Sequence, residues 1–162
     1  MADLDLTVTV EDDAWVGALP KPDALCEAAV RAALGEVGID HACELSIALT
    51  GNDRVQDLNR EWRDKDKPTN VLSFPAGDDP DAAQAQGRPE MLGDIVLAFG
   101  VTRDEATEQG LEFEHHVTHL VVHGVLHLLG YDHIEDDDAE EMETLESTIL
   151  KGLGLRDPYG DE

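Results

Sequence analysis

Histidines are concentrated in one short stretch of the sequence, and their spacing constrains the fold more than any other feature. Five of the seven histidines lie within residues 115–127, and a sixth is His133. On a helix, His123 and His127 are about one turn apart, so both rings can face the same point. Gly130 is suited to end that helix and to let His133 return toward the pair. The pattern H-x3-H-x2-G-x2-H therefore predicts three imidazoles around one metal ion.

The chemistry of three imidazoles points to a catalytic zinc site. They leave a fourth position on Zn²⁺ for water, whereas structural zinc sites usually have four protein ligands that include thiolates. Cys26 and Cys43 are distant from the histidines in sequence, and we expect both to pack in the core. We predict one zinc ion per chain, although the same ligands also suit Ni²⁺, Cu²⁺ or Co²⁺.

Other residues are expected to support the three ligands. His119 and His127 are roughly 12 Å apart along the helix axis, too far to bind one ion together, so His119 is expected to pack beside a ligand. Asp94 or Asp132 is expected to accept a hydrogen bond from the second nitrogen of a ligand ring. No functional role is expected for His41, His115 or His116.

The histidine spacing is also that of metzincin metallopeptidases. In those enzymes a glutamate follows the first histidine and acts as general base. Gly124 occupies that position here. A peptidase would need another base, for which Asp132 and Glu135 are the nearest candidates in sequence. The metallopeptidase interpretation stays open, but it lacks its usual base.

A second cluster in the sequence is cationic and consists of Arg60, Arg63, Lys65 and Lys67. The formal net charge is −26, because 37 residues are Asp or Glu and only 11 are Lys or Arg. This cluster is therefore where a phosphate would be attracted. An arginine can bind phosphate oxygens and stabilise charge that grows in a transition state. Zinc-activated water and an arginine of this cluster would together suit attack on a phosphodiester. The alternative is that these cations only neutralise the acidic residues between them.

Hydrophobic patterning predicts one α+β domain over residues 1–162, with a mixed sheet of about four strands and about five packed helices. The strands are expected at 4–10, 43–50, 70–74 and 92–99, and the helices at 22–37, 52–62, 101–109, 111–129 and 138–151. No apolar period marks residues 76–91, which are expected to form an exposed, flexible loop.

The N-terminal sequence and the charge bear on location and partners. The first residues lack the cationic start and apolar run of a signal peptide, and no stretch approaches the ~20 apolar residues of a membrane span. A cytoplasmic protein without a membrane partner is expected. The acidic charge also argues against binding anionic membranes or DNA through a broad surface.

Three segments together resemble the YbeY endoribonuclease family of bacterial ribosomal RNA maturation factors. They are LNREWRDKDKPTNVLSFP (58–75), LGDIVLA (92–98) and HLVVHGVLHLLGYDHIEDDDAEEME (119–143). The resemblance implies a zincin-like core, zinc held by His123, His127 and His133, and hydrolysis of single-stranded RNA. It also implies that Arg63 is catalytic.

The resemblance further implies a role in 3′-end maturation of small-subunit ribosomal RNA and in ribosome quality control. The implied partners are single-stranded ribosomal RNA, the small ribosomal subunit with its proteins, and an assembly GTPase. Lys65 and Lys67 are expected to contact the substrate. Intrinsic RNA affinity is expected to be weak, because the net charge repels polyanions. The alternative from another class of function is a noncatalytic, zinc-stabilised ribosome assembly factor.

Overall fold

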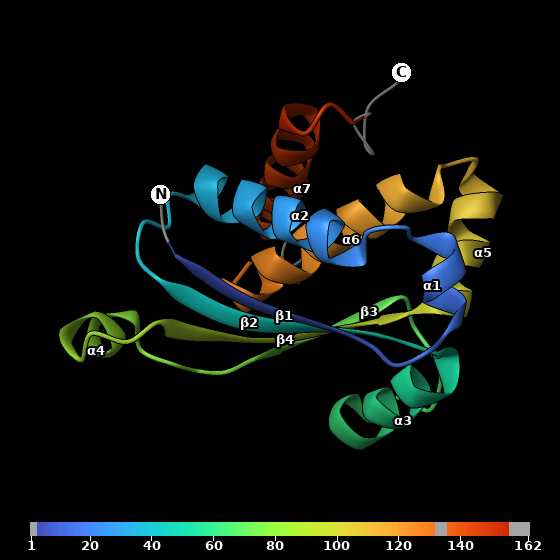
Figure 1. Ribbon diagram of the computed structural model, residues 1–162, viewed down its shortest axis with the longest axis horizontal. Coiled ribbons are helices and arrows are strands. Elements are labelled where there is room, and N and C mark those ends of the chain that lie inside the picture. The colour runs from blue at the N-terminus through green and yellow to red at the C-terminus, as the bar shows by residue number, and fades with distance from the viewer. Residues whose placement is uncertain (1–2, 132–135, 156–162) are drawn as a thin grey trace.

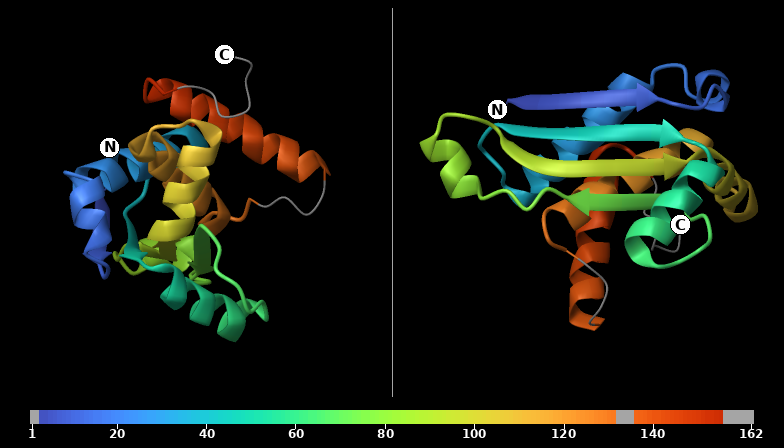
Figure 2. Two further views of the ribbon diagram at one scale, coloured as in Figure 1. Left: turned by 90° about the vertical axis from the view of Figure 1, so that its right-hand side faces the viewer. Right: turned by 90° about the horizontal axis from the view of Figure 1, so that it is seen from below.

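The computed structural model describes residues 3–131 and 136–155, and four strands in these ranges form one mixed sheet in the order β1-β2-β4-β3. β1 (Leu4–Val10), β2 (Cys43–Thr50) and β4 (Glu90–Ala98) run parallel. β3 (Val71–Pro75) pairs with β4 in the opposite direction and forms one edge of the sheet, as Figure 2 shows from below. The predicted four-stranded mixed sheet is confirmed.

Seven helices are present in the described residues, and they are unevenly distributed over the sheet (Figure 1). One face is covered by α2 (Pro22–Val37), α6 (Phe113–Leu128) and α7 (Asp136–Gly152), and the other face by α3 (Asn52–Arg63). α1 (Ala14–Ala18) and α5 (Phe99–Gln109) lie at the end of the sheet where β4 ends, and α4 (Pro80–Ala85) lies at the opposite end. The predicted α+β class is confirmed.

The main core lies between the sheet and helices α2, α6 and α7. Leu45, Ile47 and Leu49 of β2 are buried in it, as expected for alternating residues on one face of a strand. β4 contains a bulge at its register shift, and this lets both Leu92 and Ile95 join the same core. The neighbours of Ile95 along β4 therefore face α3.

Two short helices, α1 and α4, are absent from the sequence-based prediction. α4 lies within residues 76–91, so the prediction of an irregular loop there is wrong at 80–85, and β4 begins two residues earlier than expected. Asp79 caps α4 by accepting a hydrogen bond from the backbone N–H of Asp81, Pro80 occupies the first turn, and Ala83 is buried. Helices of five or six residues are too short to show an apolar period.

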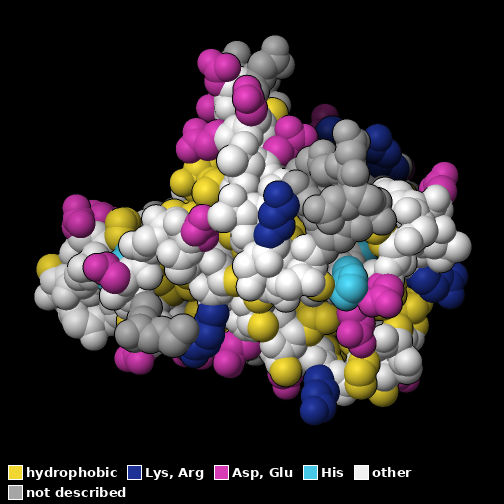
Figure 3. Space-filling view, turned by 90° about the horizontal axis from the view of Figure 1, so that it is seen from above, with side chains coloured by type: hydrophobic (Ala, Val, Ile, Leu, Met, Phe, Trp, Pro, Cys, Tyr) yellow, Lys and Arg dark blue, Asp and Glu magenta, His cyan; other side chains and the backbone are white. Residues whose placement is uncertain are grey.

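The surface of the helical layer carries both acidic and cationic side chains. Figure 3 shows Asp and Glu side chains spread over this face rather than gathered in one patch. Within the described ranges, no helix combines the length and the apolar character needed to cross a membrane.

Candidate metal centre and cationic cleft

Helix α6 presents His123 and His127 on the side that is not buried in the core. The Nε2 atoms of these two rings lie 3.0 Å apart, and the ring planes are at 82°. Zinc binds imidazole nitrogen at 2.0–2.1 Å, so two ligand nitrogens of a tetrahedral site are about 3.3 Å apart. The pair therefore fits two ligands of one ion.

The end of α6 directs the chain past this histidine pair. Gly130 follows the helix with a φ of +104°, and the backbone N–H of Tyr131 donates to the carbonyl oxygen of Leu126 at 3.0 Å. Gly130 and Tyr131 line the same cleft as the two histidines. His133 and Asp132 come next in the sequence but lie outside the described residues, so their roles stay predictions.

Glu146 of α7 forms hydrogen bonds with two histidines of α6 and was not predicted from the sequence. Its Oε1 atom lies 2.6 Å from Nδ1 of His123 and 3.3 Å from Nε2 of His119. Complete burial would raise the pKa of Glu146, but the hydrogen bonds with the two histidines outweigh it and lower the pKa to about 2. A carboxylate at Nδ1 holds the proton there and leaves Nε2 of His123 to face His127.

The sequence did contain a signal for Glu146. This residue lies on the same face of α7 as the buried Met142, Ile149 and Leu150. A carboxylate on an apolar helix face needs a buried partner, because an isolated buried charge is strongly unfavourable.

The structure does not bring Asp94 to the histidines. Ile95 faces α6, so the preceding residue turns to the opposite face of the sheet. There Asp94 is exposed beside α3, in a groove that it shares with Arg54 and Trp62. Glu146 makes the contact that was expected of an aspartate.

Arg63, the last residue of α3, reaches the cleft around the edge strand β3. Its guanidinium lies 5.4 Å from the centre of the Phe74 ring and donates a hydrogen bond from Nη2 to the backbone oxygen of Ser73. The hydroxyl of Ser73 donates to the carbonyl oxygen of Gly124 at 3.2 Å. Ser73 therefore connects the arginine to the turn of α6 between the two histidines.

The segment after α3 is held by Asn59, which is buried. Its side-chain amide donates to the backbone carbonyl oxygen of Lys67 at 2.9 Å. Its backbone carbonyl oxygen accepts from the backbone N–H of Lys65 at 3.2 Å. Lys65, Lys67 and Arg63 all line the histidine cleft. Arg60 does not; it forms ion pairs with Asp57 and Asp66.

The cleft has a volume of about 710 Å³ and a cationic lining. Three cationic side chains, the two histidines and polar groups of residues 69–73 line it, and its described lining contains no Asp or Glu. The chain has 37 acidic residues, so the lack of carboxylates among the described residues of the wall is a marked local departure from its composition. Such a cleft favours an anion.

Gly124 points toward the sheet rather than into the cleft. A Cβ atom at this position would lie 3.0 Å from Cγ2 of Ile95. A glutamate here would therefore be directed at the core, so the general base of a metzincin has no room. Glu146 is completely buried against two histidine rings and is not placed to replace that base.

Comparison with known proteins gives a family match over most of the chain. A model of the family described as Endoribonuclease YbeY matches residues 11–154. The Endoribonuclease YbeY of Paramagnetospirillum magneticum is 50% identical over 160 residues, which cover 98% of each chain. The protein of the same name from Azorhizobium caulinodans is 50% identical over 158 residues and 96% of each chain.

A solved structure shares the fold over the whole chain. The solution structure of a protein from Thermotoga maritima matches with a TM-score of 0.52 and 24% sequence identity, over 99% of this chain and 100% of the other. The match of the family model and the half-identical relatives together decide the assignment: the chain belongs to the YbeY endoribonuclease family.

Proposed function

We propose that this protein is a metal-dependent endoribonuclease that hydrolyses phosphodiester bonds of single-stranded RNA. The observation that carries the proposal is the cleft in which paired imidazoles face three cations and the described lining has no carboxylate. A metal-binding pair explains only the histidines, whereas an anionic substrate explains the cations as well. The names of the half-identical relatives support the same reaction.

The metal would be held by His123 and His127, with His133 as the predicted third ligand. Glu146 would orient His123 through its Nδ1 atom. A zinc ion at this position supplies Lewis-acid activation of water and of a phosphate oxygen. The metallopeptidase alternative lacks its usual base, because a side chain at position 124 would be directed at Ile95, and the other candidates, Asp132 and Glu135, lie outside the described residues. The cations of the cleft favour a phosphodiester as substrate.

Arg63 would stabilise negative charge on the phosphate as it grows. One Nη2 hydrogen bond to Ser73 and the contact with Phe74 hold the guanidinium at the rim of the cleft. Its other N–H groups are donors suited to phosphate oxygens. A preorganised donor of this kind typically contributes about 10²–10³ to a rate. Lys65 and Lys67 would contact flanking phosphates.

RNA binding is expected to be weak and sensitive to salt. Neutralising a phosphate on a single strand contributes about 0.7 to the slope of log K against log salt, so the three cations of the cleft predict a slope of about −2. The net charge of −26 repels RNA elsewhere on the surface. Another molecule would then have to position the protein on its RNA substrate.

We infer that this placement comes from the small ribosomal subunit in the cytoplasm. The resemblance of residues 58–75, 92–98 and 119–143 to ribosomal RNA maturation factors supports this role. On this proposal the protein acts in 3′-end maturation of small-subunit ribosomal RNA and in ribosome quality control. Ribosomal proteins and an assembly GTPase would be its partners.

The proposal is tested with Arg63→Ala and its neighbour Arg60→Ala as matched control. The assay combines metal content by mass spectrometry with cleavage of a single-stranded ribosomal RNA fragment. Arg63→Ala should retain its metal and lose at least about 100-fold in cleavage. Arg60→Ala should retain both, because Arg60 is engaged with Asp57 and Asp66 outside the cleft.

Three outcomes would contradict the proposal. Full cleavage by Arg63→Ala would remove that residue from the mechanism, and undiminished cleavage after removal of metal by a chelator would remove the metal. Bound zinc with no cleavage of either free RNA or ribosomal subunits would favour the noncatalytic assembly factor instead.

A further inference from the structure

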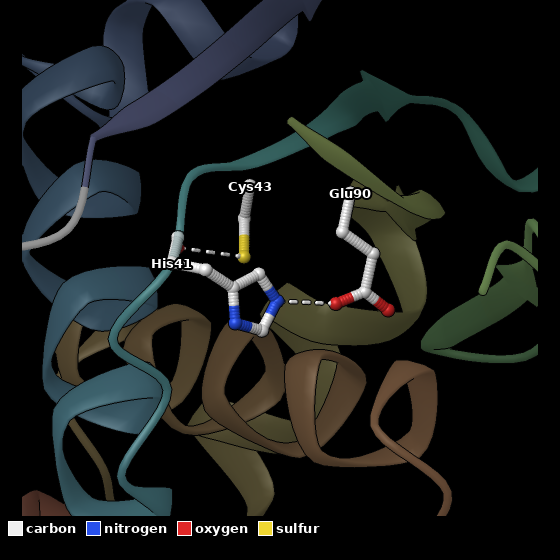
Figure 4. Close-up of side chains that lie close together, drawn as sticks. All are labelled: His41, Cys43 and Glu90. Atoms are coloured by element: carbon white, nitrogen blue, oxygen red, sulfur yellow. Dashed lines mark hydrogen bonds and ion pairs between the residues drawn. The ribbon is translucent and has the colours of Figure 1, made fainter. Parts of the chain in front are cut away.

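A second group of side chains of the types that bind metals lies at the end of the sheet near α4. His41 precedes β2, Cys43 is the first residue of β2, and Glu90 is the first residue of β4. Figure 4 shows the sulfur of Cys43 above the His41 ring and the Glu90 carboxylate facing the ring nitrogen. None of the three lines the cleft that contains His123 and His127.

The backbone of the sheet brings these three residues together. Cys43 and Glu90 are direct partners in the parallel pairing of β2 with β4, so their side chains leave the sheet on the same face. The backbone N–H of Glu90 donates to the carbonyl oxygen of Ala42 at 2.9 Å, and that of Cys43 donates to Asp3 at 3.0 Å. The segment that carries His41 is thereby held beside β4.

The donor atoms are already close to the spacing that a metal needs. One imidazole nitrogen, one sulfur and one carboxylate oxygen all lie within 4.8 Å of one another, and Nε2 of His41 is 2.6 Å from Oε1 of Glu90. Tetrahedral zinc with bonds of 2.0–2.3 Å separates its ligand atoms by about 3.3–3.8 Å. The shortest and longest of these spacings therefore differ by no more than about 1 Å from those that such an ion needs.

The environment is also that of a small, enclosed site. Cys43 is 1% exposed, and the side chains of His41 and Glu90 are 15% and 14% exposed. A sulfur, an imidazole and one carboxylate suit zinc or cobalt, whereas Mg²⁺ and Ca²⁺ prefer oxygen ligands alone. Water can reach a fourth position because two of the three side chains are partly exposed.

We propose that His41, Cys43 and Glu90 form a second site for a divalent transition metal, which links the start of β2 to the start of β4. On binding, the Cys43 sulfur forms a bond to the metal and its thiol proton passes to solvent. The proton between Nε2 of His41 and Oε1 of Glu90 moves to Nδ1 of His41, and Nε2 and Oε1 each form a bond to the ion. The site does not depend on the proposed nuclease function.

Cobalt distinguishes this site from the histidine pair. A thiolate bound to Co²⁺ gives a charge-transfer band in the near ultraviolet, and the expected ligands of the other site include no sulfur. Metal-free, reduced, full-length protein is titrated with Co²⁺. Because the histidine site also takes Co²⁺, the band should saturate by two equivalents in the parent. It should do the same in Cys26→Ala, the matched control that removes the chain's other thiol, which is buried on α2.

Three variants decide the proposal. Cys43→Ala should abolish the band, while His41→Gln and Glu90→Gln, which leave the buried thiol in place, should weaken Co²⁺ binding at least tenfold. Absence of the band in the parent, or its persistence in Cys43→Ala, would overturn the proposal. Neither result would touch the metal at His123 or the cleavage assay, so the two proposals fail separately.

Discussion

Replacing Glu146 with glutamine tests whether a buried carboxylate prepares His123 to bind metal. The carboxylate is fully buried, and its Oε1 atom is 2.6 Å from Nδ1 of His123. Glutamine has nearly the same size but no charge. A partner at the second nitrogen of a ligating histidine contributes about ten- to a hundredfold to metal affinity. Glu146→Gln should therefore weaken zinc binding by that factor, which corresponds to about 1.4–2.7 kcal/mol.

The affinity is measured by competition between the metal-free protein and a chromophoric zinc chelator. A Cys43→Ala background removes the thiol group near α4 from the titration. Glu143→Gln is the matched control, because Glu143 lies on the same helix but is exposed. Circular dichroism of each metal-free protein checks that the fold is retained.

The two variants separate an effect on the site from an effect of charge. Glu143→Gln removes the same charge from α7 and should leave zinc affinity within about twofold of the parent, because an exposed charge at that distance is screened. If Glu146→Gln also bound zinc within twofold of the parent, the carboxylate would have no part in preparing His123, and the reasoning would be wrong.

Three further predictions concern the segments that build the cleft and its surroundings. Gly124→Ala should lower the free energy of unfolding in urea by about 1–3 kcal/mol, because its Cβ would lie 3.0 Å from Cγ2 and 3.1 Å from Cδ1 of Ile95. Adding Ile95→Val, which removes Cδ1, should recover part of the loss, and full stability of the single variant would contradict this packing. Asn59→Ala should cost about 1–3 kcal/mol and speed amide exchange in residues 64–68, because the Lys67 carbonyl loses its buried donor; unchanged exchange there would argue against the role given to Asn59. The hydrogen bond from Arg88, with a backbone hydrogen bond from Met91, holds the pKa of Asp78 well below its usual range, so this carboxylate stabilises residues 76–91 above the pKa of an unfolded aspartate and loses that effect as pH falls through the lower folded value. Asp78→Asn should therefore speed exchange in this segment at pH 7 but converge with the parent in strong acid, and a difference that persisted there would assign the effect to something other than the charge.

The parts of the site that could be predicted from the sequence are those that one segment determines. The spacing of His123 and His127 follows from the helical repeat, and Gly130 ends the helix because a positive φ suits glycine. Arg63 and Lys65 are close in sequence, so their proximity to each other needed no knowledge of the fold. Their position beside the histidines depends on the packing of β3 against α6. The regular strands and the longer helices were predictable for the same reason, because each shows its own apolar period.

The parts that could not be predicted depend on how distant segments pack. Glu146 meets His123 only because α7 docks beside α6, and the apolar face of α7 indicated that a buried carboxylate needed a partner without indicating which one. The side of the sheet on which Asp94 lies was likewise not predictable from its own segment. The register shift in β4 sets which residues face α6, and that shift depends on pairing with β2.

The net charge of −26 and the cationic cleft act over different distances, which resolves their apparent conflict. At physiological ionic strength exposed charges are screened beyond about 8 Å, so a phosphate inside the cleft responds mainly to Arg63, Lys65 and Lys67. An RNA chain that approaches from solution instead meets the summed acidic surface, which slows association. A protein built in this way can act on a phosphodiester that is brought to it and yet bind little free RNA. An enzyme whose selectivity comes from the assembly that presents its substrate needs this combination of local attraction for phosphate and weak binding of free RNA.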